Sequence, residues 1–367
     1  MNNFFKKAAA GCGAFFAILV VCLVLSAGGF LIFGNYHPRP VEKADVSCPE
    51  SAPTLNSGQD VKVLTWNVQT MSSKNYIFWS DLPNNDGPDE KPSQEDITAT
   101  FEESVRVIRA ENPDIIFIQE IDDGAERTYY EDQMTRLTGM LPEYPCYTSV
   151  FDWKSIYVPH PRIHGSVGWK VAILSKYKIS DAERIQLTTA NKSFLENQFK
   201  IQPAILKAVM PTSDGGQFAA LTLHLDLYVP GTDAKNTQLS EIDKVVSGLD
   251  SAGIPWVLGG DFNLLPYDDA AYQRLAPEQQ KYYNPESEIK FLTDKYRVVP
   301  TTEETNGPDF EEWLTRWPND PSITGPDRTL DYFFLSDRLE IGDHYVRSDD
   351  TLHISDHLPV IIKLQIP

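Results

Sequence analysis

Six short segments end a strand-like apolar run in carboxylate, amide or imidazole side chains. Carboxylates are ligands that hard divalent cations prefer, and an imidazole can act as an acid, a base or a hydrogen-bond donor. The ends of strands are where open α/β sheets usually bind ligands. The pattern predicts a phosphate-binding, metal-binding site built from Thr65-Trp66-Asn67, Ile118-Gln119-Glu120, Leu221-Thr222-Leu223-His224-Leu225-Asp226, Leu258-Gly259-Gly260-Asp261-Phe262-Asn263, Arg328-Thr329-Leu330-Asp331-Tyr332-Phe333 and Ile354-Ser355-Asp356-His357.

None of these segments is specific by itself. Glu120 taken alone is more often a surface carboxylate, and Asn67 is more often a turn residue. His224 is as often a satisfied core histidine as a catalyst. The information lies in the order and completeness of the set.

Taken in order, the motifs resemble the endonuclease/exonuclease/phosphatase superfamily of deoxyribonuclease-like phosphoesterases. The most specific are Gly260-Asp261-Phe262-Asn263 and Ser355-Asp356-His357-Leu358-Pro359-Val360. The similarity runs from about Val61 to Pro367. It implies an α/β fold, a four-layered α/β sandwich in which two packed sheets lie between helices.

The resemblance also implies a metal site. Glu120 would hold a Mg²⁺ or Mn²⁺ ion, with Asn67 beside it. Asp356 would lie near a second possible metal position. This agrees with phosphoryl-transfer chemistry, which needs neutralisation of oxygen charge and in-line positioning.

The same resemblance implies roles for the acid, base and donor groups. Asp261 would orient or deprotonate the attacking water, or protonate the leaving oxygen. Asn263 and His224 would donate to non-bridging phosphate oxygens. His357 would contact the scissile phosphate, held by Asp331, because a carboxylate fixes the tautomer and orientation of an imidazole.

The segment from Tyr157 to Lys170 is rich in proline, tyrosine and histidine. Arg162 is a candidate substrate-binding residue there, as are His160 and His164. An ordinary surface loop is the alternative that its proline content favours.

Alternating strand-like and helix-like segments indicate one α/β domain over residues 61–367. A helix is expected from Ser93 to Asn112, because Ser93 and Asp96 resemble a capping box and the apolar residues repeat every three to four positions. A second helix is expected at 233–249. Residues 264–328 show weak periodicity and are expected to form long loops over a site. Strands are expected at 61–68, 114–120, 167–175, 204–210, 217–225, 255–259, 329–335 and 357–365.

An uncharged stretch at residues 8–34 is long enough for a transmembrane anchor. Lys6 and Lys7 precede it, so residues 1–7 are expected in the cytoplasm and the domain outside. A cleaved signal peptide, which would give a secreted protein, is the alternative. Residues 35–60 lack periodicity and are expected to be a stalk.

The charge and the cysteine content of the chain disfavour two classes of protein. Residues 36–367 hold 30 basic and 52 acidic side chains, a balance that disfavours proteins coating nucleic acid. The four cysteines form no close pair typical of a metal motif. Cys48 and Cys146 can form a disulfide if the domain faces an oxidising compartment.

Three hypotheses follow from these patterns. The first is a membrane-tethered phosphodiesterase acting outside the cytoplasm on lipid head groups or small phosphoesters. The second is a nuclease of the same mechanism. The third is a binding module with a dead site, against which the intact set of motifs argues.

Overall fold

The chain folds into two packed β-sheets, each mixing parallel and antiparallel pairs. The computed structural model describes residues 15–26, 28–29, 35–82, 84–163, 165–190, 193, 199–227 and 229–367. Within them, the first sheet runs β1 (Val41–Lys43), β7 (Asp181–Gln186), β8 (Ala204–Pro211), β9 (Gln217–His224), β10 (Trp256–Asp261), β12 (Asp331–Leu335) and β11 (Arg297–Val299). The second runs β13 (Glu340–Val346), β14 (Val360–Gln365), β3 (Asp60–Asn67), β4 (Ile115–Asp122), β6 (Gly165–Ser175), β5 (Cys146–Val158) and β2 (Val46–Ser47).

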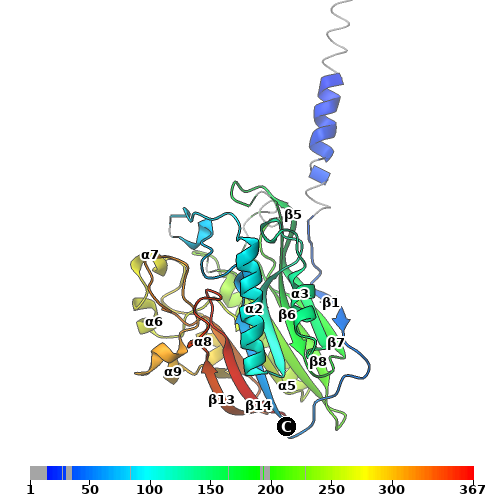
Figure 1. Cartoon of the computed structure of the whole chain (residues 1–367), viewed down its shortest axis with the longest axis vertical. Helices are drawn as coiled ribbons and strands as arrows, with labels where there is room; N and C mark the ends of the chain where they lie inside the picture. Colours follow the sequence, from blue (N-terminus) through cyan, green and yellow to red (C-terminus); the bar gives the residue numbers. More distant parts are fainter. Residues whose placement is uncertain are drawn as a thin grey trace, which may run out of the picture.

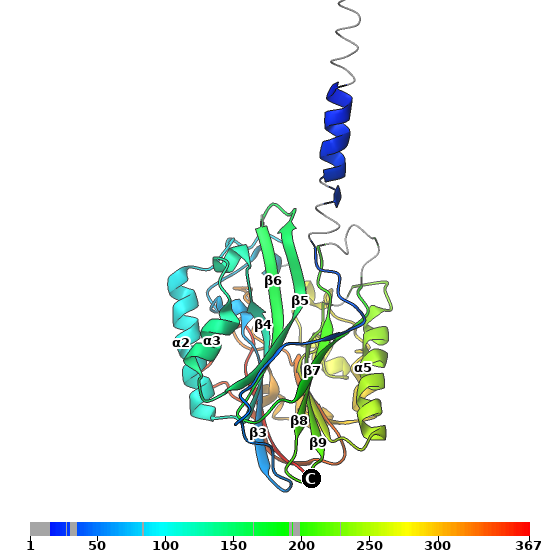
Figure 2. The same cartoon turned by 90° about the vertical axis from the view of Figure 1, so that its right-hand side faces the viewer.

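Helices cover the outer faces of both sheets, which makes four layers. In Figure 2, α2 and α3 lie outside the second sheet and α5 lies on the opposite side, outside the first. The sequence-based expectation of a four-layered α/β sandwich is confirmed for the domain. The helices are α2 (Gln94–Glu111), α3 (Gln133–Met140), α5 (Ala234–Ser251), α6 (Asp269–Gln273), α7 (Pro277–Gln280), α8 (Lys290–Thr293) and α9 (Thr302–Asn306), with 3-10 turns η1 (Gln69–Met71), η2 (Trp79–Asp81), η3 (Glu126–Thr128) and η4 (Phe310–Trp313).

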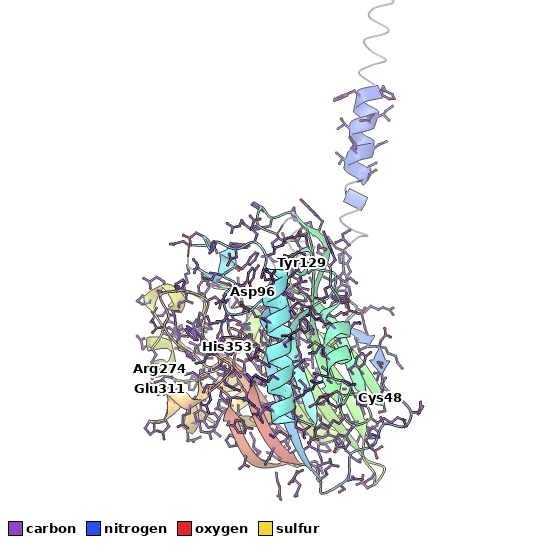
Figure 3. All side chains as sticks on the ribbon, in the orientation of Figure 1. Cys48, Asp96, Tyr129, Arg274, Glu311 and His353 are labelled. Carbon is purple, nitrogen blue, oxygen red and sulfur yellow. A yellow bond between two sulfur atoms is a disulfide. The ribbon has the colours of Figure 1, made fainter. Side chains whose placement is uncertain are left out.

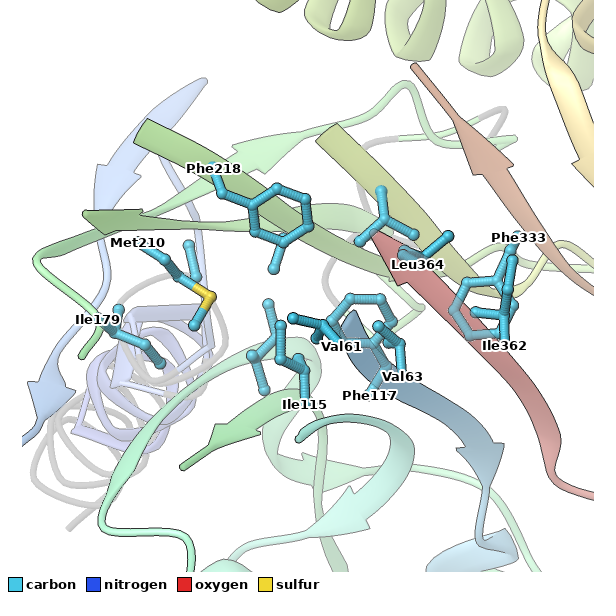
Figure 4. Packing of buried hydrophobic residues seen from close by; sticks show 14 of the residues in the cluster. Val61, Val63, Ile115, Phe117, Ile179, Met210, Phe218, Phe333, Ile362 and Leu364 are labelled. Carbon is cyan, nitrogen blue, oxygen red and sulfur yellow. The ribbon is translucent and has the colours of Figure 1, made fainter. Parts of the chain in front are cut away.

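The inner faces of the two sheets share one apolar core. Val63 and Phe117 of the second sheet pack in the same buried cluster as Phe218 and Phe333 of the first, and Figure 4 shows these side chains converging between the sheets. Phe117 and Phe333 approach to 6.1 Å between ring centroids. Burying such rings is the main favourable term in packing the sheets together.

The long helices begin and end where local chemistry predicts. Ser93 caps α2, its hydroxyl accepting a hydrogen bond from the Asp96 amide at 3.0 Å. Asn112 ends the helix in a left-handed conformation. The expected helix at 233–249 is α5.

Residues 36–60, expected to be a stalk, are packed on the domain. Their strand β1 pairs with β7 and their strand β2 pairs with β5, so each lengthens one sheet at its edge. Cys48 and Cys146 form a disulfide that ties this segment to β5. Figure 3 shows Cys48 on the β-sheet side of the molecule, away from α2.

The predicted transmembrane anchor at residues 8–34 lies partly outside the described residues. Residues 15–26 form a helix, drawn in dark blue beyond the domain in Figure 1. Among the residues that the structure describes, no helix has the length and apolar character needed to cross a membrane.

Candidate catalytic site

The polar strand ends meet because their strands are direct neighbours. In the first sheet, Asp261 ends β10 opposite His224 of β9 on one side and Asp331 of β12 on the other. In the second sheet, Asn67 ends β3 opposite Gln119 of β4. The site therefore combines the ends of both sheets.

His357 is held on one side of Asp261. Its Nδ1 lies 2.8 Å from Oδ2 of Asp331, and its Nε2 lies 3.5 Å from Oδ2 of Asp261. The indole of Trp66 donates to the backbone carbonyl of His357 at 2.9 Å, which fixes the segment. The side chains of His357 and Asp331 are both buried. The predicted orientation of His357 by Asp331 is therefore geometrically in place.

His224 forms a second histidine–carboxylate pair on the other side. Its Nδ1 lies 3.2 Å from Oδ2 of Asp152, and its Nε2 lies 3.7 Å from both Glu120 and Asp261. Asp152 is completely buried on β5 and was absent from the residues expected from sequence. Its position between Phe151 and Trp153 in a strand carries no local sign of contact with His224.

Electrostatics favour a charged centre. Burial opposes protonation of both imidazoles, but the surrounding carboxylates, Asp152 beside His224 and Asp331 beside His357, raise the pKa of each histidine to about 9. Burial also works against ionisation of Asp261, yet the two histidines lower its pKa overall. The carboxylates therefore favour the protonated form of both histidines, and the histidines favour the ionised form of Asp261.

Glu120 points into the cleft from a strained backbone. It lies in the left-handed region with φ of 56°, at a register shift between Ile118 and Ile121. Asn67 donates its Nδ2 to Oε1 of Glu120 at 3.0 Å and to Oδ2 of Asp261 at 3.1 Å. Burial raises the pKa of Glu120. A divalent cation would offset this burial of carboxylates, so the donor set fits Mg²⁺ or Mn²⁺.

A second group of potential ligands lies nearby. One atom each of Asp261, Asp331 and His357 fall within 4.8 Å of one another. His357 Nδ1 is already hydrogen-bonded to Asp331 at 2.8 Å, so it is not available as a metal ligand. We therefore assign this group to proton handling and Glu120 to the metal.

Asn263 and Asp356 both line the cleft. Asn263 donates to the carbonyl of Leu225 at 2.7 Å, and its Oδ1 is buried without a partner within the described structure. Oδ2 of Asp356 accepts a hydrogen bond from the Arg316 guanidinium at 3.1 Å, and the two side chains form an ion pair. Their predicted roles, phosphate contact and second metal position, stay predictions.

The substrate contact expected of Arg162 stays a prediction. Its guanidinium donates to the carbonyl of Gly87 at 2.7 Å and lies 3.6 Å from a carboxylate oxygen of Glu90. These contacts attach the turn between β5 and β6 to the segment around Gly87. His160 stacks on Trp79 at 4.5 Å, and His164 lies outside the described residues.

A cavity of about 260 Å³ opens beside the centre, and His357 and Asp331 are not among the residues that line it. Its floor is polar, with Glu120, His224 and Asp261. One wall is apolar, formed by Trp153, Ile163, Trp169, Ile201 and Leu227. Residues 264–328 contribute Gln279, Tyr283 and Arg316 to the lining. They were expected to form long loops, but they include the short helices α6 to α9 and strand β11.

Comparisons with known proteins agree with the motifs and the fold. The model of the endonuclease/exonuclease/phosphatase family matches residues 64–357. No curated protein matches the chain. A solved endonuclease/exonuclease/phosphatase from Beutenbergia cavernae is 23% identical, with a TM-score of 0.55, over 84% of this chain and 72% of that one.

The human Nocturnin catalytic domain, solved with a bound sulfate anion, is 17% identical with a TM-score of 0.52. That alignment covers 88% of this chain and 97% of that one, and at this identity it supports the fold alone. The family model, in contrast, spans most of the chain and every predicted motif from Asn67 to His357. The chain belongs to the endonuclease/exonuclease/phosphatase family, whose members are metal-dependent phosphoesterases and nucleases.

Proposed function

We propose that the chain is a divalent-metal-dependent phosphodiesterase, tethered to a membrane and acting outside the cytoplasm. The observation that carries the proposal is the arrangement around Asp261. Two buried histidines, each held by its own carboxylate, flank this residue at 3.5 and 3.7 Å. A fold retained without its chemistry, as in the dead-module hypothesis, would have no need of two such pairs.

A metal ion would be held by Glu120, with Asn67 beside it. When bound, it would neutralise charge on the phosphate oxygens. Asn67 keeps the Glu120 carboxylate in place through its 3.0 Å hydrogen bond. Whether the ion is Mg²⁺ or Mn²⁺ is a matter for titration.

The residues around the substrate phosphate would carry the other catalytic roles. The Asp261 carboxylate, held ionised by its neighbours, would orient and deprotonate the attacking water. His357 and His224, whose protonated forms the neighbouring carboxylates favour, would donate to phosphate oxygens as negative charge develops. Asp331 and Asp152 would hold the two rings in the orientation that points Nε2 at the phosphate.

A lipid head group or a small phosphoester is the substrate that the surroundings favour. The apolar wall beside the catalytic centre suits an apolar leaving group. The Ser155 hydroxyl donates to Asn35 at 2.7 Å, so the N-terminal segment joins the domain on β5, about 10 Å along the strand from Asp152. Ile156 and Tyr157, next on β5, are exposed. An anchor that precedes Asn35 would therefore lie close to the cleft, which supports a lipid substrate.

A nuclease is the second candidate. Trp169 lies 5.8 Å from the ring of His224, and an indole in that position could stack on a base. The net charge of −20 weighs against it, because non-specific nucleic-acid binding depends on phosphate contacts from basic residues.

A substrate panel tests the proposal. The full-length protein would be assayed with Mg²⁺ against vesicles containing sphingomyelin or phosphoinositide, plasmid DNA and bis-p-nitrophenyl phosphate, each with and without EDTA. We expect metal-dependent hydrolysis of the lipid or the small diester. Preferential cleavage of DNA would favour the nuclease, and full hydrolysis in EDTA would refute the metal mechanism. A sample carrying His357→Ala controls for contaminating hydrolases.

A further inference from the structure

Arg316 lies beside the catalytic histidine and was not expected from the sequence. Isolated backbone bridges join it to Arg328 on one side and to His357 on the other. Its neighbour Trp317 donates a backbone hydrogen bond to the carbonyl of Asp356 at 2.9 Å. Backbone hydrogen bonds therefore hold the Arg316-Trp317 segment against the Ser355-Asp356-His357 motif. They keep the Arg316 side chain at the cleft.

The side chain of Arg316 pairs with Asp356. One terminal nitrogen donates to Oδ2 of Asp356 at 3.1 Å. The two side chains are 20% and 9% exposed, so the pair is largely shielded from solvent. Within the described structure Glu120 has no ion pair with an arginine or a lysine, and its ion-pair partner is the imidazole Nε2 of His224, at 3.7 Å.

We infer that Arg316 replaces a second metal ion: the site binds one divalent cation at Glu120, and the Arg316 guanidinium supplies the other positive charge to the phosphate. The inference rests on the proposed function and specifies the charges at that site. Asp356 is then a carboxylate that holds Arg316, not a metal ligand.

The chemistry of the guanidinium supports this assignment. Arginine stays protonated in proteins, so a cation entering at Asp356 would meet a fixed positive charge in a poorly solvated site. Its planar set of donors also matches phosphate oxygens. The Nε of Arg316 is buried and has no hydrogen-bond partner within the described structure. Arg316 lines the same cavity as Glu120 and Asp261, where a substrate phosphate would lie.

Lys74 provides a matched control. It is a second cation near Asp356, but its ammonium donates to the carbonyl of Pro318 at 3.0 Å and to Asn319 at 2.8 Å. It lies 4.7 Å from the ring of Trp317. Lys74→Met therefore removes a nearby positive charge without breaking the pair between Arg316 and Asp356.

Counting bound Mn²⁺ by electron paramagnetic resonance tests the inference on the full chain. We expect one ion per chain in the wild type, in Lys74→Met and in Asp356→Asn. Arg316→Gln, which frees Asp356, should bind two, and the double variant Arg316→Gln/Asp356→Asn should return to one. At one bound ion, turnover of Arg316→Gln should fall about 10²-fold, the effect of losing one transition-state donor.

Several counts would overturn the inference. Two ions in the wild type, none in Asp356→Asn, or one in Arg316→Gln would each do so. The Asp356→Asn result stands even if Arg316→Gln fails to fold. If the expected numbers of bound Mn²⁺ ions are found but no phosphoester is hydrolysed, the proposed function is refuted and the assignment of charges stands.

Discussion

The Nδ1 atom of His224 lies 3.2 Å from Oδ2 of Asp152, and this pair mirrors the 2.8 Å pair of His357 and Asp331 across Asp261. Both carboxylates are completely buried. Each carries one oxygen without a partner within the described structure, so its hydrogen bonding is directed at the histidine. We interpret Asp152 as a residue that positions His224 for catalysis.

Asp152→Asn should lower turnover about 10- to 100-fold, because His224 loses the carboxylate that orients its ring and favours its protonated form. Steady-state rates on bis-p-nitrophenyl phosphate measure this, with thermal melting as the check on folding. Asp181→Asn, which removes an exposed carboxylate on β7, is the matched control and should be neutral. An unchanged turnover in a folded Asp152→Asn protein would remove the residue from the mechanism.

His357→Ala and Asp261→Ala should each lower turnover at least ~10²-fold, since acid–base groups contribute about that much. Because His357 and Asp331 act as one unit, Asp331→Asn should add little further loss in the His357→Ala background. Single-turnover rates separate the chemical step from substrate binding. Near-normal rates in the folded single variants would contradict these roles.

Much of the site could be predicted because strand ends carry their own signal. The apolar runs before Asn67, Glu120 and Asp261 predict strands, although Gln119 precedes Glu120 and two glycines precede Asp261. Once those strands pair in register, their ends must meet. The order of motifs then identifies the family, and the family implies the fold.

The rest depends on tertiary contacts. Asp152 lies inside β5, 72 residues from its partner His224, and Arg316 belongs to a region without periodicity. Strands β1 and β2 have three and two residues, too few to show the alternation that marks a strand. Residues 36–60 consequently resembled a stalk, although pairing and a disulfide attach them to the sheets.

Removing the disulfide should destabilise the domain. Cys48 and Cys146 are 98 residues apart, so the bond restricts a long loop in the unfolded chain, and its loss should cost about 2–5 kcal/mol. Urea unfolding of Cys48→Ser/Cys146→Ser against the wild type measures the difference. Peptide mapping of the unreduced protein should recover the two cysteines as one cross-linked pair. Two separately alkylated cysteines in that sample would show that the bond does not form.

Asp81→Asn should stabilise the protein above pH 6. Burial, with a contribution from Asp356, raises the pKa of Asp81 to about 6. The unfolded state therefore releases the proton first, and the unfolding free energy falls as pH rises from about 4 to 6. Asparagine can still accept from the Phe78 amide, as Asp81 does at 2.8 Å.

The variant should gain roughly 1–3 kcal/mol over the wild type at pH 7 and little at pH 4. Denaturant unfolding at both pH values tests this, because the other titrating groups are common to both proteins. A difference that does not change with pH would show that Asp81 titrates normally.

The side of the membrane on which residues 36–367 lie limits which substrates the cleft can reach. Lys6 and Lys7 precede the apolar run, and the next charged residue is Arg39. Long domains cross a membrane largely regardless of their charge, so the two lysines should set the orientation, with residues 36–367 outside. Protease added to intact cells or spheroplasts should digest the domain, and the uncleaved chain should stay with the membrane after high-salt and carbonate washes. Lys6→Glu/Lys7→Glu should weaken this orientation.

Protection in intact cells, with digestion only after lysis, would reverse the topology. A soluble form beginning near Gly28–Asn35 would identify the segment as a cleaved signal peptide, and the proposed membrane tether would then fall while the catalytic assignment stands.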